Sequence, residues 1–316
     1  MRFLIVDIRK RVGPTDTPHY AVQRRLDVLS ERNITGETCH YDNLDLSVEE
    51  GALVIRACGI PLTEYTHIIM RGHRTLYEYM LKQYVAAYAQ KHGIRLQNAR
   101  IIQKLPHYTK TIQMVLLAQA GIPYVDSFYC VDGLYWQKED ALKRIGFPLI
   151  YKHTEGGYRI DTIKGENKTK KNIFLINTKE ELRNACLEWD QPEEQFLTKP
   201  STYFIQKYVP TGEDYRSILI GGRFLSAWKR SATGSFLTVN KGQYALVASP
   251  DKDFIDLSER TAQLLEADYC AVDIIYDNGK PHVLEINMNP GFKSFETKLE
   301  GNTVDIASAI IDNMLN

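Results

Sequence analysis

The sequence contains few cysteines, and nothing ties them into a recognisable site. The five are Cys39, Cys58, Cys130, Cys186 and Cys270, with no Cys-x-x-Cys pair and no histidine cluster nearby. They are predicted to be reduced thiols, mostly small buried residues, in a cytoplasmic protein.

Long apolar runs and an excess of one charge are also missing. No apolar run approaches the ~20 residues that a membrane-spanning helix needs, so we expect no membrane segment. Lys plus Arg and Asp plus Glu both number 39, which gives a formal net charge of zero. This balance argues against a general binder of nucleic acids or membrane surfaces. The start of the chain reaches Asp7 too early for a signal peptide.

The 316 residues are enough for two or three subdomains, each with its own core. In residues 1–105, apolar runs of strand length alternate with segments of helical spacing. Such alternation is typical of a doubly wound α/β domain with a covered parallel sheet. Residues 106–205 are predicted to form a central subdomain, and residues 206–316 a strand-rich C-terminal one.

Two apolar strand-like runs near the C-terminus carry polar side chains where hydrophobic ones are expected. Asp273 lies in the first run, and Glu285 and Asn287 lie in the second. A carboxylate removed from water costs several kcal/mol unless it is paired or bound to a cation. These hard oxygen ligands suit Mg²⁺ and the phosphates that it bridges. The alternative is a two-sided strand with its acids in solvent; the apolar flanks favour burial.

The turn between these runs decides whether the three side chains meet. A two-residue Asn278-Gly279 turn would place Asp273 opposite Leu284, whereas a five-residue loop over 277–281 would place it opposite Glu285. Pro281 has no N–H for the ladder, which favours the longer loop. In such a crowded acidic site, neutralising one carboxylate is expected to preserve or raise the stability of the fold.

Two lysines occupy positions suited to phosphate binding. Lys152 ends an apolar strand and is followed by Gly156 and Gly157, where backbone N–H groups can approach an anion. Lys110 opens a predicted helix. For each lysine the alternative is a long side chain that reaches into solvent.

The segment 206–216 runs from a strand through a Pro/Gly turn into a second strand. Its first part can offer free backbone groups to a base, and the residues concerned are Gln206, Lys207, Tyr208 and Val209. Asp214 can accept hydrogen bonds from ribose hydroxyls, while Arg216 and Arg230 can make forked contacts to carboxylate or phosphoryl oxygens. The alternative is a surface Asp–Arg pair worth ~0–1 kcal/mol.

Taken in this order, these segments resemble the ATP-grasp carboxylate–amine ligases, most closely the RimK-like glutamate ligases, over about residues 105–316. The resemblance implies an ATP-grasp fold, α/β overall and α+β in its grasp part, behind an N-terminal doubly wound pre-ATP-grasp domain. It assigns nucleotide phosphates to Lys110 and Lys152, ribose to Asp214, and the acyl phosphate to Arg216 and Arg230. It assigns adenine to Gln206, Lys207, Tyr208 and Val209, and Mg²⁺ to Asp273, Glu285 and Asn287. Thr238 and Lys241 fall in a segment similar to the family's loop near the γ-phosphate and the acceptor.

The chain departs from the family pattern at three places. Arg159 and Asp161 stand in a lid loop that usually holds more glycine, and Lys207 replaces a frequent hinge acid. The loop around Thr238 lacks the usual Arg, Ser and Asn. We therefore still expect nucleotide binding, whereas these differences leave the acceptor chemistry open.

The resemblance implies an ATP-dependent ligase that joins a carboxylate to an amine through an acyl phosphate and releases ADP and phosphate. It implies ATP and two Mg²⁺ ions as cofactors, with Mn²⁺ as a substitute. The acceptor is an amino acid, a peptide or a protein. Two alternatives remain, namely an enzyme that modifies a ribosomal peptide or protein, by macrocyclisation or amino-acid addition, and a non-catalytic nucleotide-binding partner protein. Whether the chain forms a homo-oligomer is also left open.

Overall fold

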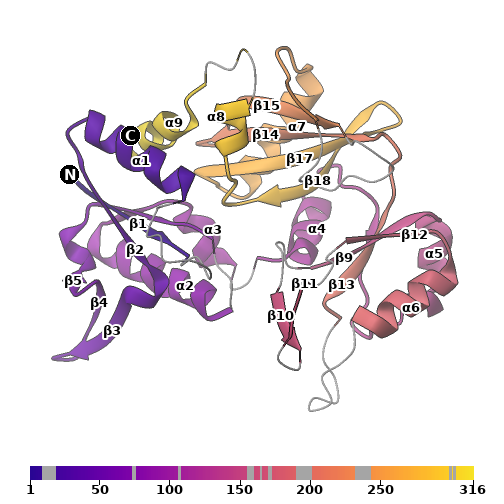
Figure 1. Cartoon of the computed structure of the whole chain (residues 1–316), viewed down its shortest axis with the longest axis horizontal. Coiled ribbons are helices and arrows are strands. Elements are labelled where there is room, and N and C mark those ends of the chain that lie inside the picture. Colours follow the sequence, from indigo (N-terminus) through magenta and orange to yellow (C-terminus); the bar gives the residue numbers. More distant parts are fainter. Residues whose placement is uncertain are drawn as a thin grey trace.

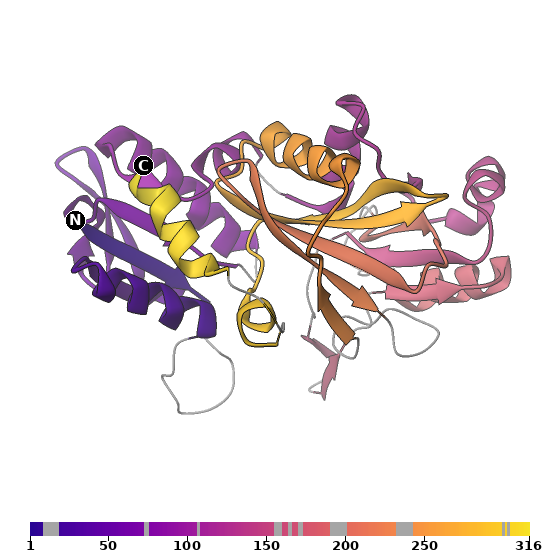
Figure 2. The same cartoon turned by 90° about the horizontal axis from the view of Figure 1, so that it is seen from above.

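The chain folds into three parts that follow one another along its long axis, with the C-terminal sheet between the N-terminal and central parts (Figures 1 and 2). The structure is a computed structural model. It describes residues 1–8, 19–72, 76–105, 108–154, 160–163, 166–169, 173–189, 201–231, 243–298, 301 and 304–316.

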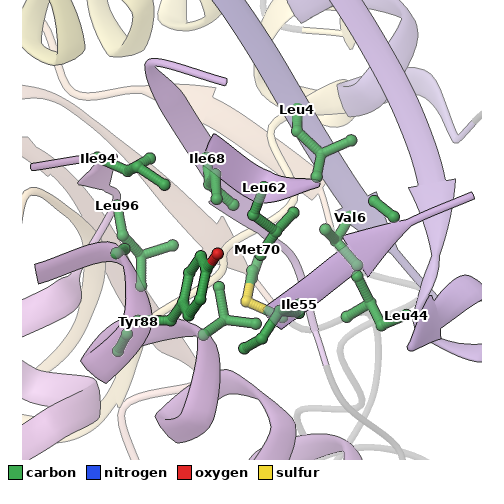
Figure 3. Packing of buried hydrophobic residues seen from close by; sticks show 14 of the residues in the cluster. Leu4, Val6, Leu44, Ile55, Leu62, Ile68, Met70, Tyr88, Ile94 and Leu96 are labelled. Carbon is green, nitrogen blue, oxygen red and sulfur yellow. The ribbon is translucent and has the colours of Figure 1, made fainter. Parts of the chain in front are cut away.

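The N-terminal part is built on a parallel sheet with the strand order β2-β1-β6-β7. Its strands are β1 (Arg2–Asp7), β2 (Thr35–His40), β6 (His67–Met70) and β7 (Arg95–Leu96). Side chains of β1 alternate between two cores, so Phe3 packs with α1 (Tyr20–Glu31) and Leu4 packs with α2 (Leu76–His92). Figure 3 shows the second of these cores. The two helices therefore cover opposite faces, and the predicted doubly wound domain is confirmed.

An antiparallel insertion lies between β2 and β6. The apolar run at 53–57 predicts its middle strand, but its other strands and their antiparallel pairing were not predicted. The insertion contains β3 (Leu44–Glu49), β4 (Ala52–Ala57) and β5 (Ile60–Pro61), flanked by the short helices η1 (Tyr41–Asn43) and η2 (Leu62–Glu64). A short helix, α3 (Ala99–Lys104), then leads to the central part.

The central part contains a four-stranded antiparallel sheet with the order β12-β9-β13-β8. Its strands are β8 (Ser127–Phe128), β9 (Leu149–His153), β12 (Ile173–Ile176) and β13 (Tyr203–Lys207). Its helices are α4 (Lys110–Gln119), η3 (Tyr135–Gln137), α5 (Glu139–Ile145) and α6 (Lys179–Trp189). A separate hairpin joins β10 (Ile160–Ile163) to β11 (Glu166–Thr169). The apolar spacing of residues 124–131 predicts a longer strand than the two residues of β8. Just before β8, Val125 instead donates its N–H to the carbonyl of Val283 in the C-terminal sheet, at 3.1 Å.

The C-terminal part is an antiparallel sheet with the order β16-β15-β14-β17-β18. Its strands are β14 (Glu213–Ile220), β15 (Arg223–Ser231), β16 (Gln243–Leu246), β17 (Tyr269–Asp277) and β18 (Lys280–Asn287). Helix α7 (Lys252–Leu264) packs on this sheet, and α8 (Lys293–Lys298) and α9 (Ile306–Leu315) follow it. Within the described ranges, no helix has both the length and the apolar character to cross a bilayer.

The last helix returns to the first domain. Helix α9 lies beside α1 (Figure 2), and its Ile306, Ile310 and Met314 share a core with Phe3 and Ile5 of β1. That core continues into β14, β15 and β17 of the C-terminal sheet. The segment 206–316 therefore contains a helix that packs on the N-terminal domain.

Candidate active site

The hairpin between β17 and β18 has a two-residue turn, so the predicted five-residue loop is wrong. Asp277 pairs with Lys280, and the turn residues Asn278 and Gly279 have positive φ angles of 51° and 75°. Pro281 is accommodated because β18 is the edge strand of the sheet, where a missing N–H disrupts no further pairing.

A β-bulge then restores the predicted meeting of the carboxylates. The ladder pairs Ile274 with Val283 and resumes with Asp273 opposite Glu285, which leaves Leu284 as the extra residue of β18. The predicted juxtaposition of Asp273 and Glu285 is therefore confirmed, although it arises from a bulge rather than from the loop.

Two arginines hold the carboxylate of Asp273. Arg216 lies opposite Asp273 on the neighbouring strand β14 and donates from Nε and Nη2 to its two carboxylate oxygens, both at 2.6 Å. Arg230 on β15 donates a further hydrogen bond to this carboxylate at 3.1 Å. Burial raises the pKa of Asp273, but the arginines outweigh this effect and hold the pKa below its usual range. Asp273 therefore sits among cations, which reverses the expectation that neutralising it preserves or raises stability.

Asp214 is part of the same buried network. Arg230 lies opposite it and donates from Nε at 2.7 Å and from Nη2 to its carboxylate. Both side chains are 8 % exposed, so the alternative of a surface pair is wrong. Burial raises the pKa of Asp214, and Arg230 opposes this shift. The assignment of Asp214 to ribose stays a prediction.

Both predicted phosphate-binding lysines are buried, so the alternative of solvent-facing side chains is wrong. Lys110, at the start of α4, places Nζ 3.2 Å from the carboxylate of Glu285. Lys152, on β9, has its Nζ 5.1 Å from the centre of the Phe204 ring and makes no ion pair with any described residue. Burial lowers the pKa of Lys152 to about 8, against the influence of Glu285. Burial also raises the pKa of Glu285, but Lys110 and Lys152 bring it below its usual value.

The oxygen donors Asp273, Glu285 and Asn287 lie at one end of the hairpin. The side-chain oxygen of Asn287 accepts a hydrogen bond from the N–H of Asn289 at 2.9 Å. Across the described residues, no three His, Cys, Asp or Glu side chains form a metal-binding group. The donor chemistry fits Mg²⁺, and Asp273 would have to share its oxygens with Arg216 when a metal is bound.

The predicted hinge begins with the last two residues of β13 and continues into the loop after it. Gln206 is buried and donates to the hydroxyl of Ser127 at 2.9 Å, while Lys207 reaches Asp277 at 2.5 Å. No backbone carbonyl in the described ranges accepts from the N–H groups of Tyr208 and Val209. Free backbone donors at this position are what a base-binding hinge requires.

Part of the predicted site lies outside the described residues. This applies to Thr238 and Lys241, and to residues 155–159 of the lid loop. Of the remaining lid residues, Asp161 is described only through the backbone of β10.

Two supporting amides were missed in the sequence. Gln113 of α4 bonds to both backbone groups of Ile286, at 2.8 and 3.0 Å. The side chain of Asn98, just before α3, bonds to Tyr269 and to the carbonyl of Met288. Gln113 is an amide in an otherwise apolar stretch, the same signal that identified Asp273, whereas Asn98 has polar neighbours and gives no such signal.

The described part of the site gathers four cations and three carboxylates between the central and C-terminal parts, beside a hinge with free donors. Its cations are Lys110, Lys152, Arg216 and Arg230, and its carboxylates are Asp214, Asp273 and Glu285. This arrangement fits a site for the phosphates of a nucleotide, as the resemblance to the ATP-grasp ligases implies.

Comparison with known proteins agrees. A family model described as the RimK-like ATP-grasp domain matches residues 108–314, so the chain belongs to this family and is an ATP-dependent ligase. A probable alpha-L-glutamate ligase of Rhodopirellula baltica is 23 % identical over 301 residues, which cover 93 % of this chain and 68 % of that protein.

Solved structures share the fold across almost the whole chain. The RimK domain ATP-grasp protein of Sphaerobacter thermophilus superposes with a TM-score of 0.69 at 17 % identity and covers 100 % of both chains. The ATP-grasp ligase PsnB, in complex with a variant of its minimal precursor, Mg and ADP, has a TM-score of 0.66 at 19 % identity and covers 99 % of this chain and 97 % of that one.

Proposed function

We propose that the protein joins a carboxylate to an amine, with ATP as the activating substrate and ADP and phosphate as products. The observation that carries this proposal is the buried pairing of Arg216 and Arg230 with Asp273, opposite Glu285 and its partner Lys110.

The charge balance of the site supports an anionic substrate. Four cations face three carboxylates, which leaves one positive charge in excess. The Nη1 groups of Arg216 and Arg230 have no acceptor among the described residues, so each retains donors for phosphoryl or carboxylate oxygens. Lys152, one of these four cations, has no ion pair with a described residue, so its charge can serve a phosphate.

The proposed reaction has two displacements. A substrate carboxylate oxygen attacks the γ-phosphorus of ATP, and ADP leaves with the electron pair of the broken bond. The amine then attacks the acyl carbon, phosphate departs, and the amine loses a proton. The protein contributes position and charge neutralisation through its lysines and arginines.

Mg²⁺ fits this proposal through the oxygen donors Asp273, Glu285 and Asn287. When bound, it would neutralise phosphate charge and orient the outer phosphates. We propose two ions, as in the sequence-based expectation, with Mn²⁺ as a substitute.

The test is a trapping experiment. Purified protein is incubated with ATP, Mg²⁺, hydroxylamine and a panel of amino acids and organic acids, and hydroxamates are detected by mass spectrometry. We expect one ADP per hydroxamate and no accumulation of AMP. Formation of AMP and pyrophosphate would contradict the proposal, and Arg230→Ala should lower the trapping rate by roughly 10²–10³-fold with little change in ATP affinity.

A peptide acceptor is the second candidate. It is favoured by the fold shared with PsnB, whose structure contains a precursor peptide. A peptide product that has lost one water in the presence of ATP would support it. ATP binding without any product from acids or peptides would instead support a non-catalytic nucleotide-binding protein.

A further inference from the structure

The N-terminal sheet has a topological switch point between β1 and β6. From β1 the chain crosses one face through α1 to β2, and from β6 it crosses the other face through α2 to β7. In open parallel sheets, ligands bind outside the carboxyl ends of the strands at such a point. Here Asp7 ends β1, and Arg71 directly follows β6.

Buried charges gather at this point. Arg71 donates to the carboxylate of Asp7 at 3.0 Å, and both are largely buried. Arg25 of α1 has no exposed surface, and Lys82 and Glu78 of α2 are also buried nearby. Among the described residues, three basic side chains therefore share this interior with the carboxylates of Asp7 and Glu78, and Glu296 also acts on Arg25. Burial lowers the pKa of Lys82 to about 7, so the two arginines are the lasting positive charges.

Two hydrogen-bond donors of Arg25 have no acceptor among the described residues. Its Nη1 donates to the carbonyl of Ala21 at 2.8 Å, and its guanidinium lies 5.8 Å from the centre of the Tyr269 ring and 5.1 Å from that of Phe292. Its Nε and Nη2 are buried, and no described side chain or backbone group accepts from them or from Nε of Arg71.

The unused edge of Arg25 is the one with which this protein binds carboxylates. Arg216 uses Nε and Nη2 to hold Asp273, and Arg230 uses the same two nitrogens to hold Asp214. A buried cation with vacant donors is costly unless an anion meets it. Burial and the nearby Arg71 lower the pKa of Arg25 only to about 10, so the side chain stays charged at neutral pH.

The cluster lies directly behind the candidate active site. Tyr269 donates its hydroxyl to the carbonyl of Pro290 at 2.9 Å, and a Cβ on Gly72 would lie 3.7 Å from the side-chain amide of Asn289. Asn289 in turn bonds to Asn287. The pKa of Tyr269, raised by burial, is lowered in part by Arg25, Arg71 and Arg216. Tyr269 therefore lies near both groups of arginines, and it contacts the loop after β18 through Pro290.

We propose that Arg25 and Arg71 form a second anion site that binds a carboxylate group of a small-molecule substrate. Its assignment to a substrate rests on the proposed ligase function. The carboxylate belongs either to the acid that is activated, which then carries two carboxylates, or to an amino-acid acceptor.

The test measures binding without turnover. The melting temperature is recorded in acetate, glutarate or L-glutamate against sodium chloride at equal ionic strength, with no ATP. We expect at least one carboxylate to stabilise the wild type, and Arg25→Met and Arg25→Lys to weaken that effect by about tenfold or more, because neither offers a forked edge. Arg32→Met, at the C-terminal cap of the same helix and in a partly exposed pair with Asp312, should respond like the wild type.

Folding failure is separable from loss of binding. Arg25→Met removes an unsatisfied buried charge, so its melting temperature without ligand should equal or exceed that of the wild type. The proposal is overturned if no carboxylate stabilises the wild type, or if Arg25→Met is stabilised equally.

The outcome is independent of whether the protein is a ligase. If carboxylates stabilise the wild type but not Arg25→Met, and the wild type forms no hydroxamate, the anion site is supported and the ligase reaction is refuted. If trapping succeeds, the Michaelis constant that rises in Arg25→Met, for the acid or for the amine, identifies which substrate the site holds.

Discussion

The protonation state of Lys152 depends on its burial and on the charged groups near its ammonium group. Burial lowers its pKa to about 8; Lys110 adds to this shift and Glu285 opposes it. A bound phosphate would raise the pKa again, so nucleotide binding above this pH requires uptake of a proton.

We expect the affinity for ATP with Mg²⁺ to be full below pH ~8 and to fall above it, by up to about tenfold for each further pH unit. Calorimetric titrations across this range measure the effect. Lys152→Arg keeps its charge throughout and should remove the inflection. An affinity of the wild type that does not change with pH would contradict this role.

Asp273 stabilises the fold as well as the site, because it is the shared partner of Arg216 and Arg230. Its lowered pKa means that this stabilisation is complete above the unfolded pKa of ~3.9 and is lost as the pH falls below it. At neutral pH, Asp273→Asn leaves two buried guanidinium groups with a weaker partner.

We expect Asp273→Asn to lower the free energy of unfolding by on the order of 3 kcal/mol without nucleotide, measured by denaturant titration. Glu213→Gln is the control, since Glu213 pairs with Lys229 at the partly exposed start of the neighbouring strand β14. It should cost about 1 kcal/mol or less. Equal stability of Asp273→Asn and the wild type would show that the arginines do not depend on this carboxylate.

At the scale of elements, one amide joins the first domain to the catalytic hairpin. Asn98 adopts φ 59°, and its side chain donates to the carbonyls of Tyr269 and Met288 while accepting from the N–H of Tyr269. Its position ties the start of β17 to the end of β18, where Asn287 lies.

Asn98→Ala should therefore destabilise the protein by about 2–4 kcal/mol, since buried backbone groups lose their partners, and should weaken Mg²⁺-dependent nucleotide binding. Asn98→Asp keeps the acceptor for the N–H of Tyr269 but places a buried carboxylate oxygen against the carbonyls of Tyr269 and Met288, so it should be destabilised at least as much. Thermal unfolding with and without ATP and Mg²⁺ measures both effects. The bridging role is refuted if Asn98→Ala melts like the wild type.

The sequence predicts the long elements well because their apolar spacing is unambiguous. Helix α6 (Lys179–Trp189) and strand β6 (His67–Met70) have the predicted bounds. The short helices α3 and α8 span little more than one turn, too few residues for a periodic pattern. In the insertion, β4 contains an apolar run and is predictable, whereas the exposed β3 and the two-residue β5 lack a continuous apolar signal.

The candidate site was predictable where polar residues interrupt apolar runs, as at Asp273 and Glu285. What could not be predicted is which partners they meet. The bulge at Leu284 and the pairing of Asp214 with Arg230 both depend on the register between strands, which turn residues alone do not determine. Arg25 gave no signal, because an arginine in an amphipathic helix usually faces solvent.

At the scale of the whole molecule, one core links the two ends of the chain. Ile310 of α9 is buried with Phe3 and Ile5 of β1 and with Ile218 and Trp228 of the C-terminal sheet. The central part has a separate core around Tyr151 and Tyr203. The N-terminal domain and the C-terminal sheet should therefore unfold together, while the central part can unfold separately.

Ile310→Ala tests this coupling, because it removes a buried side chain from the shared core. We expect a loss of about 2–5 kcal/mol and faster hydrogen exchange in β1, α1, β14 and β17, with little change in β9 and β13. Leu315→Ala, at the partly exposed end of the same helix, should have a much smaller effect. Faster exchange confined to α9 would show that the helix is only attached to the surface, and an equal increase in β9 would show a single cooperative unit. If the expected pattern is found, the buried arginines at the switch point and those of the active site lie within one cooperative unit, because Tyr269 and Phe292 beside Arg25 belong to that same core.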